Sequence, residues 1–377
     1  MTVIATTATR SSKGQLADSA KAPKARNEVR AAPAAFPEPP VKLLRDPIPK
    51  PPKKKRSTGK VRLVLDHGES TEVTGIVYGL EHRVVAPTYR MSVFLDSYNR
   101  RIKVLDYKAE DYGAMVLKLR FLAEANKFDK IWITANERDW GEFLKHGYVL
   151  EGILRYHNRG RDSYFVSKFR SQRRMHSKGL MKEILLVEEV LARQTRGGPK
   201  PLPPGYTLDF ARERDVDGML KLYRQVFKTY PSPLTYRDYL LSILQRDAIF
   251  RVIRREGVPV AAASAELDPK RHAAELTDCA THSDERGKGL IGIILNALEN
   301  DLRHRRYRCA FTLARAQSYG MNAAFHSLGY EFNGRLVNNC DIYGAYEDMN
   351  IWVKDLRPHK RAKGKARPKC AAAKPKQ

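Results

Sequence analysis

A basic, glycine-spaced segment, Arg286-Gly287-Lys288-Gly289, stands between a predicted strand at 273–281 and an apolar helical stripe that begins at Leu290. A strand that leads through such a turn into a helix favours anion binding. The first N–H groups of a helix lack partners within the helix and lie at the positive end of its dipole, and glycine lets a phosphate come close to the backbone. The segment therefore predicts a phosphate site, to which Arg286 and Lys288 add charge.

Two common phosphate motifs do not occur in the sequence. A P-loop needs GxxxxGK followed by Ser or Thr, and the dinucleotide fingerprint needs GxGxxG with an acidic residue about 20 residues later. A nucleoside triphosphatase and a nicotinamide-dependent enzyme are therefore disfavoured.

The elements that must position this turn form an α/β pattern with a mixed sheet. Helical spacing of apolar residues predicts helices at 214–227, 235–246, 290–302 and 320–330. Alternating or continuous apolar runs predict strands at 207–211, 248–255, 258–267, 273–281, 309–316, 331–339 and 349–356. The order is one strand, two helices, three strands, helix, strand, helix and two strands, in a domain over 205–357.

The chain before this domain carries a related pattern over 61–171. A hairpin at 91–107 and a helix at 109–126 precede a strand at 130–136, a short helix at 139–148 and two final strands. Phe143-Leu-Lys-His-Gly-Tyr148 matches Phe325-His-Ser-Leu-Gly-Tyr330, which suggests an internal repeat. This half has DYKAEDYG in place of the basic glycine turn, so we expect it to have lost the phosphate loop and to serve as structure or as a cover for the substrate.

The two halves are joined by a predicted helical segment and linker at 172–204. The linker is the Gly- and Pro-rich stretch QTRGGPKPLPPG, which removes both helix and strand options.

Most of the formal charge of +27 lies in the two ends of the chain. Residues 1–60 contribute +10 and residues 357–377 contribute +9. Both ends are rich in Ala, Pro and Lys, so we expect disordered extensions at 1–60 and 358–377. They are solubilising tails or weak contacts with nucleic acid or an anionic surface. Four cysteines without a CxxC pair, no secretory signal and no long apolar run favour a reduced, cytoplasmic setting without a membrane span.

The glycine turn in this context resembles the Gcn5-related N-acetyltransferase superfamily. The pattern in this superfamily is Arg or Gln-x-x-Gly-x-Gly or Ala, and here it is Arg286-x-x-Gly289-x-Ile291, with Gly292 next to the position of the missing small residue. The strings AELTDCATHSDERGKGL, TLARAQSYGMN, LVNNCDIYG and EDMNIWVKDL resemble more narrowly the β-lysine N-acetyltransferases, over about residues 70–356. In that family the catalytic domain follows a degenerate first half.

The resemblance implies transfer of acetyl from acetyl-CoA to the terminal amine of β-lysine, which gives a neutral compatible solute. It implies no metal. The cofactor would be held by the strand residues Cys279, Ala280 and Thr281, by the loop residues Arg286, Gly287, Lys288, Gly289 and Leu290, and by Asn322 and Phe325.

Acetyl transfer to an alkylammonium, whose pKa is about 10.4, needs a group that takes its proton. Glu275 matches the position of the catalytic glutamate in protein-acetylating members of the superfamily, and Asp278 is the second candidate. Strict alternation places Glu275, Thr277 and Cys279 on one face of the strand and Leu276, Asp278 and Ala280 on the other. Only one of the two carboxylates then faces the acceptor, unless a bulge intervenes. The alternative for either is a surface carboxylate paired with Lys or Arg.

The other groups of the reaction are less marked in the sequence. Cys279 is expected to be a small strand residue rather than an acyl-accepting nucleophile, because no His stands at a recognisable spacing from it. Phe325 replaces the tyrosine that many members use to protonate the leaving thiolate, so Tyr319, Tyr343 or water are the candidate acids. Substrate-binding candidates are Tyr230, Arg315, Asn338, Asn339, Asp341 and Asp348. For each of them a turn residue that bonds its own backbone is the alternative.

Two other functions stay open at this point. One is a protein or polyamine acetyltransferase that the basic tails bring to its target, and the other is a non-catalytic acyl-CoA-binding module. The sequence does not indicate an oligomeric state.

Overall fold

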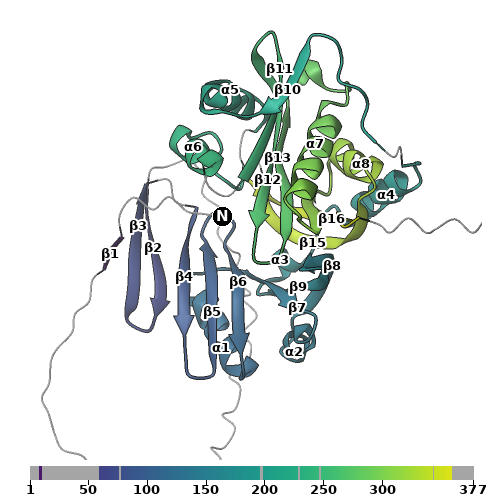
Figure 1. Ribbon diagram of the computed structural model, residues 1–377. Helices are drawn as coiled ribbons and strands as arrows, with labels where there is room; N and C mark the ends of the chain where they lie inside the picture. The colour runs from purple at the N-terminus through teal and green to yellow at the C-terminus, as the bar shows by residue number, and fades with distance from the viewer. Residues whose placement is uncertain are drawn as a thin grey trace, which may run out of the picture.

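One mixed sheet of 13 strands runs through both halves of the molecule in this computed structural model (Figure 1). The structure describes residues 8–10, 59–75, 78–195, 198–227, 230–245, 248–342 and 344–358. The strand order in the large sheet is β10-β11-β12-β13-β14-β16-β15-β8-β9-β7-β6-β5-β4, and a three-stranded sheet has the order β1-β3-β2. The predicted fold class, an α/β fold with a mixed sheet, is confirmed.

The second half has the predicted order of elements. Its strands are β10 (Tyr206–Phe210), β11 (Ala248–Arg255), β12 (Val258–Asp268), β13 (Ala273–Thr281), β14 (Cys309–Arg315), β15 (Glu331–Ile342) and β16 (Ala345–Asp355). Its helices are α5 (Val216–Val226), α6 (Arg237–Gln245), α7 (Leu290–His304) and α8 (Tyr319–Ser327), with 3-10 turns η1 (Glu213–Asp215) and η2 (Ser283–Glu285).

Helices cover both faces of this half of the sheet. Figure 1 shows α5 and α6 on one side of β12 and β13, and α7, α8 and α4 (Leu180–Leu191) on the other. The predicted stripe on α7 explains its position, because Leu290, Ile294, Leu298 and Leu302 are all at most 1% exposed. They pack on Ala261, Ala263 and Leu276 of the sheet in one apolar core.

The first half repeats the strand order of the second. Its elements are β2 (Gly59–Asp66), β3 (Glu69–Gly75), β4 (Gly79–Val85), β5 (Tyr89–Asp96), β6 (Arg101–Ala109), α1 (Tyr112–Ala125), β7 (Lys130–Asn136), α2 (Trp140–Lys145), β8 (Val149–Asn158), β9 (Arg161–Phe169) and α3 (Gln172–Met175). The order β5-β6-β7-β9-β8 corresponds to β12-β13-β14-β16-β15, and both β6/β7 and β13/β14 are parallel pairs. The strands β2, β3 and β4 were not predicted.

The halves join where β8 meets β15, and two glycines make that contact possible. Gly152 and Gly334 lie opposite each other across the two strands. A Cβ atom on Gly334 would lie 2.5 Å from the Glu151 carbonyl oxygen, and its φ of +132° is a conformation that other residues rarely adopt. The backbone approach at this seam therefore requires glycine.

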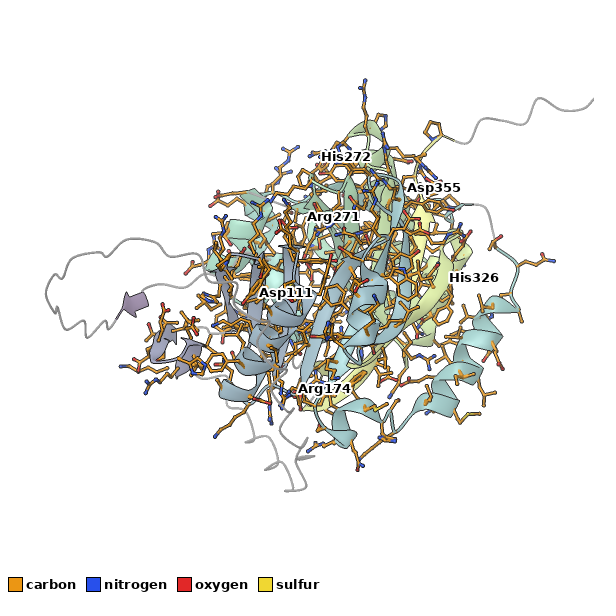
Figure 2. The ribbon with its side chains drawn as sticks, turned by 90° about the horizontal axis from the view of Figure 1, so that it is seen from below. Asp111, Arg174, Arg271, His272, His326 and Asp355 are labelled. Atoms are coloured by element: carbon orange, nitrogen blue, oxygen red, sulfur yellow. The ribbon has the colours of Figure 1, made fainter. Side chains whose placement is uncertain are left out.

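A second contact brings β6 and β7 toward β13. Trp132 and Phe165 of the first half share an apolar cluster with Ala273, Phe311 and Met349 of the second. In addition, Arg271 in the turn between β12 and β13 (labelled in Figure 2) donates a hydrogen bond to the carbonyl of Leu105 on β6, at 3.0 Å. The first half is thereby held beside the strand that carries Glu275.

The ends of the chain contribute little to the described structure. Within the stretch 1–60 only residues 8–10 (β1) and 59–60 (in β2) are described, and these residues are strand rather than disordered. The remaining tail residues, 1–7, 11–58 and 359–377, lie outside the described residues, as do the contacts predicted for them. The described chain contains no helix with the length and apolarity needed to cross a bilayer.

Candidate active site

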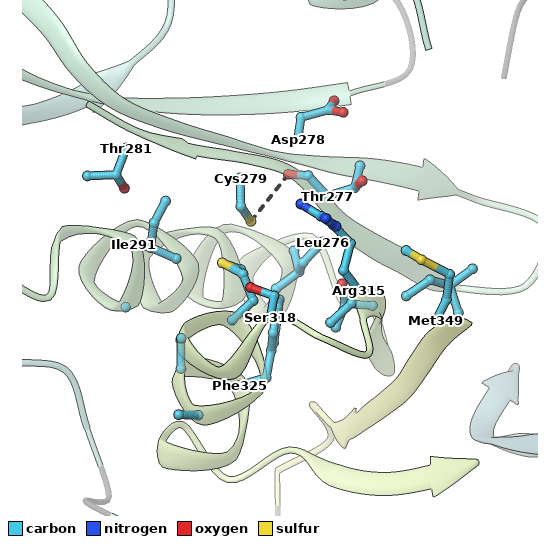
Figure 3. Close-up of a pocket in the computed structure, with 18 of the residues that line it drawn as sticks. Leu276, Thr277, Asp278, Cys279, Thr281, Ile291, Arg315, Ser318, Phe325 and Met349 are labelled. Atoms are coloured by element: carbon cyan, nitrogen blue, oxygen red, sulfur yellow. Dashed lines mark hydrogen bonds between the residues drawn. The ribbon is translucent and has the colours of Figure 1, made fainter. Parts of the chain in front are cut away.

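The parallel strands β13 and β14 separate part of the way along their length. They pair over only three positions, from Ala273 with Cys309 to Glu275 with Phe311, although β13 continues to Thr281 and β14 to Arg315. Residues on both sides of this gap line one cleft of about 1720 Å³, which also reaches α7, α8 and the linker. Figure 3 shows Leu276 and Cys279 from one strand and Arg315 beside this space.

One end of the cleft lies at the N-terminus of α7. Gly289 is the N-cap of this helix with φ of +79°, and Gly287 has φ of +80°. No side chain of the described residues caps the first turn. Arg286, Gly287, Gly289 and Leu290 line the cleft. A 15-residue helix with free first-turn N–H groups and an exposed arginine beside it has the chemistry to hold a pyrophosphate.

Lys288 of this loop has another partner. Its ammonium binds the buried carboxylate of Glu285 and the hydroxyl of Tyr206. The hydrogen bonds from Lys288 and Tyr206 hold the pKa of Glu285 at about 2. Lys288 does not line the cleft among the described residues, so it shapes the loop through Glu285.

The corresponding place in the first half is filled. Helix α1 begins with Asp111, whose side chain accepts the backbone N–H of Ala114, so its first turn is capped from within. Between β6 and β7 the hydroxyl of Tyr107 bonds Asp139 at 2.7 Å and accepts the N–H of Asn136 at 3.2 Å. The backbone N–H groups of Ala114, in the first turn of α1, and of Asn136, at the end of β7, are therefore bonded within the first half.

A β-bulge in β13 changes the alternation expected from the sequence. Ala262 pairs with Ala280 and Ser264 with Thr277, so β13 carries one extra residue between these pairs. Asp278 lies at the bulge with φ of +55°. As a result Cys279 packs with Leu276 in the core beneath α7, and strict alternation, which would separate them, is wrong here.

The bulge places Asp278 on the same face of the sheet as Glu275. In Figure 3 the Asp278 side chain points away from Cys279 and from the helix that carries Ile291. Glu266 of β12, which pairs directly with Glu275, also faces this side. All three carboxylates line the cleft.

The electrostatics of these carboxylates are unusual. Burial, followed by the charge of Glu266, raises the pKa of Glu275 to about 7. The same two causes raise the pKa of Asp278 to about 8, against hydrogen bonding from the nearby hydroxyls of Ser264 and Tyr230. Asp278 is 2% exposed and accepts from Ser264 Oγ at 2.7 Å, whereas Glu275 is half-buried. Glu275 is thus the more accessible of two carboxyls that titrate near neutrality.

Four of the predicted cofactor residues are held in the strand or the core. Burial raises the pKa of the Cys279 thiol, which lines the cleft as a neutral group. Thr281 also lines the cleft, whereas Ala280 is buried against α5 and does not. Phe325 is fully buried, lines the cleft and packs edge-on against Tyr330 at 5.0 Å.

Asn322 lies beside the cleft and fixes its wall. Its amide nitrogen donates to the carbonyls of Arg315 at 3.0 Å and Ser318 at 2.8 Å. Its oxygen accepts from Asn350 at 2.9 Å and from the indole of Trp352 at 2.8 Å. With all four bonds made inside the protein, Asn322 positions α8 against β14 and β16, and it is not among the described residues that line the cleft.

The substrate-binding candidates divide into two groups. Tyr230, Arg315 and Asn339 line the cleft, although Arg315 already makes a bidentate ion pair with Glu347, with both distances 2.7 Å. The remaining three hold the fold elsewhere. They are Asn338, which donates to the carbonyls of Arg174 and His176, Asp348, which accepts the N–H of Asn338, and Asp341, which accepts the N–H of Gly344.

The candidate acids receive no support from position. Tyr319 is not among the described residues that line the cleft. The guanidinium of Arg193 lies over its ring, 4.8 Å from the ring centroid. Tyr343 lies outside the described residues. Among the described residues no group of three or more His, Cys, Asp and Glu side chains is arranged to hold a metal ion.

Several residues of the cleft were missed by sequence reasoning, and four of them lie around its carboxylates. They are Glu266 of β12 and three from the first half, Arg101 and Lys103 of β6 and Trp132 of β7. The polar end of the otherwise apolar strand VPVAAASAELD was a signal for Glu266. The sequence alone contained no comparable signal for the other three.

Comparison with known proteins agrees with this geometry. Residues 216–330 match the model of the acetyltransferase (GNAT) family. The β-lysine N(6)-acetyltransferase of Methanosarcina mazei is 38% identical over 259 residues, which cover 63% of this chain and 95% of that protein. The β-lysine N(6)-acetyltransferase of Methanococcus maripaludis is 34% identical, over 69% of this chain and 94% of that protein. The chain belongs to this family of N-acetyltransferases.

A third relative of this chain is the N-acetyltransferase YodP of Bacillus subtilis. It is 31% identical over 263 residues, which cover 69% of this chain and 94% of that protein. The stretch that matches the family model, residues 216–330, contains helix α7 and the three carboxylates.

Proposed function

We propose that this enzyme transfers acetyl from acetyl-CoA to the terminal amine of β-lysine. One observation carries the proposal: a single cleft passes through the gap between β13 and β14, with an anion-binding helix terminus at one end and three carboxylates at the other. This arrangement lets a thioester and a cationic amine meet at the strand. The names of the two archaeal relatives support β-lysine as the amine.

On the cofactor side, the N–H groups of the Gly287–Leu290 loop and the Arg286 guanidinium would hold the pyrophosphate of acetyl-CoA. Backbone groups of β13 beyond Glu275, which β14 leaves without a pairing partner, would bond the pantetheine arm. A backbone N–H near the bulge at Asp278 would polarise the thioester oxygen.

On the acceptor side, Glu266, Glu275 and Asp278 would attract a diammonium substrate. Like charges directly opposite each other on neighbouring strands are destabilising, and Glu266 pairs directly with Glu275. A bound ammonium group relieves this repulsion, which makes the pair a site suited to a cation.

Glu275 would take the proton from the amine. The amine nitrogen then forms a bond to the thioester carbon and the C–S bond breaks. The nitrogen gives up its second proton to water, and the thiolate takes a proton from water. A base with a pKa of about 7 is half ionised at neutral pH, so it is available and still accepts a proton efficiently. The free cysteines Cys279, Cys309 and Cys340 fit the reducing cytoplasm in which we place the enzyme.

The test is acetyl-CoA turnover, read as free thiol, with β-lysine, lysine, ornithine and polyamines. We expect the highest kcat/KM with β-lysine and acetylation at N6, identified by mass spectrometry of the product. The variant Glu275→Gln should lower kcat by roughly 10²- to 10⁴-fold. Glu256→Gln, at a side chain that is 87% exposed, is the matched control. Reaction of polyamines without reaction of β-lysine would refute the proposed substrate.

A further inference from the structure

The first half of the chain closes the acceptor end of the cleft. Arg101 and Lys103 of β6 and Trp132 of β7 line the same cleft as Glu266 and Glu275, although they lie more than 130 positions earlier in the chain. Lys103 and Trp132 pair across β6 and β7, so the two side chains share a face of the sheet. A positively charged wall therefore lies next to the three carboxylates.

The two cations of this wall differ in what they already bind. Arg101 is 4% exposed, donates to Asp96 at 2.8 Å and to the carbonyl of Asn339 at 2.7 Å, and so belongs to the fold. Lys103 is half-buried and lies over the Trp132 ring at 4.8 Å. No ion pair or hydrogen bond of its ammonium occurs within the described residues, and its charge lowers the pKa of Glu275 against the effect of burial.

Two further polar groups of the same cleft lack partners. The indole N–H of Trp132 and the amide oxygen of Asn339 are buried and make no hydrogen bond within the described structure. Buried polar groups without partners are rare in native proteins and call for a ligand or water. Here a donor lies beside the Lys103 ammonium and an acceptor lies on the opposite half.

We propose that Lys103 and the Trp132 indole N–H bind the carboxylate of the acceptor, and that Asn339 and Glu266 bind the ammonium nearest to that carboxylate. This inference rests on the proposed function and names the class of acceptor for it: a diamino acid rather than a diamine. The distal amine then extends toward Glu275 at the gap between β13 and β14. The first half thus acts as the part of the enzyme that recognises the amino-acid end of the substrate.

The test compares β-lysine with 1,4-diaminopentane, which is the same molecule without its carboxylate. In Lys103→Met, kcat/KM for β-lysine should fall roughly ten- to hundred-fold, mainly through KM, because a charge-assisted bond is lost. The value for 1,4-diaminopentane should stay within about three-fold of the parent value. Any change that the variant causes in the pKa of Glu275 acts on both substrates equally, so the ratio of the two isolates carboxylate recognition.

Three further variants sharpen this result. Lys103→Arg keeps the charge and should recover most of the activity with β-lysine. Lys108→Met changes an exposed lysine of the same strand outside the cleft and should resemble the parent. Trp132→Phe keeps the ring but removes the N–H, and should cost a few-fold with β-lysine only. If Lys103→Met lowers both substrates equally, or neither, the inference is wrong while the proposed function stands.

A parent enzyme that does not acetylate β-lysine would refute the proposed function, and the inference is then read from binding. Calorimetry with the full chain would compare lysine and ornithine with 1,5-diaminopentane and 1,4-diaminobutane, which lack the carboxylate. Tighter binding of the two amino acids, lost in Lys103→Met, supports the inference. Equal binding of acids and amines overturns it.

Discussion

The pairing of Glu266 with Glu275 makes a quantitative prediction about the pH dependence of the enzyme. Glu266→Gln removes one of two like charges that lie directly opposite each other on β12 and β13, and it preserves size and polarity. Cross-strand partners have Cβ atoms about 5 Å apart. At that separation, and with an effective dielectric constant between that of a protein surface and that of water, the repulsion is roughly 1–3 kcal/mol.

This energy converts into a shift of the acidic limb of the rate profile. Because one pKa unit corresponds to about 1.4 kcal/mol, the pKa of Glu275 should fall by roughly one to two units in Glu266→Gln. The pKa of about 7 in the parent then becomes about 5 to 6. The kcat/KM for β-lysine reports the pKa of Glu275 in the free enzyme. Measured as free thiol between pH 5 and 9, it should therefore reach its plateau at lower pH in the variant.

Stability gives an independent measurement of the same repulsion. Above pH 8 the Glu275 carboxylate of the parent is ionised and is repelled by the charge of Glu266, so Glu266→Gln should unfold at a higher temperature than the parent. At pH 5 the Glu275 carboxyl is protonated in the parent, so the two proteins should unfold at similar temperatures. If the acidic limb stays near pH 7 in the variant and the unfolding temperatures do not change, burial alone sets the pKa, and the cross-strand repulsion is not its cause.

Four other changes test separate parts of the structure. Gly289→Ala should raise the KM for acetyl-CoA with little change in the KM for the amine. A residue with a Cβ atom adopts φ of +79° only at a cost of about 1–2 kcal/mol, so the substitution should distort the loop. Equal effects on both KM values would contradict this. Asn322→Ala should reduce the free energy of unfolding in urea by roughly 2–6 kcal/mol, because it leaves the buried donors of Asn350 and Trp352 without an acceptor. The control Asn333→Ala, which removes an amide that donates to the Glu331 carbonyl, should change this free energy little. Asp278→Asn should flatten the pH dependence of stability in thermal unfolding. Because the pKa of Asp278 is raised to about 8, the protonated carboxyl stabilises the folded parent fully below pH 4, and this stabilisation is lost as the pH rises to 8. The parent should therefore lose stability relative to the variant over this range. Cys279→Ala should retain most of the kcat, because the thiol is neutral and only lines the cleft. Loss of all activity in the variant, together with an acyl-enzyme trapped in the parent, would refute this role.

The features that were predicted from sequence are those encoded locally. The stripe of Leu290, Ile294, Leu298 and Leu302 specifies a helix whatever surrounds it, and the Gly287 and Gly289 turn must precede it. The bulge at Asp278 depends instead on which residues of β12 face β13, and a count along a single strand cannot show that. The alternation argument failed at Cys279 for this reason.

Glu266 and Lys103 were missed for a related cause. The importance of Glu266 comes from its register opposite Glu275, which is a property of two strands and not of either one. Lys103 reaches the cleft only because β8 and β15 continue one sheet across the seam at Gly152 and Gly334. The fold brings together residues that are distant in the chain, and local patterns in one sequence do not predict such contacts.

The two halves show how one strand order can serve two roles. In the first half the Asp111 side chain caps α1, and the Tyr107 hydroxyl bonds Asp139 and the N–H of Asn136 between β6 and β7. In the second half the equivalent helix is uncapped and the equivalent strands stay apart, and the cofactor chemistry belongs there. Lys103 and Trp132 stand opposite each other on two paired strands of the first half, β6 and β7, and a charged group recognises a carboxylate selectively when it is held in place.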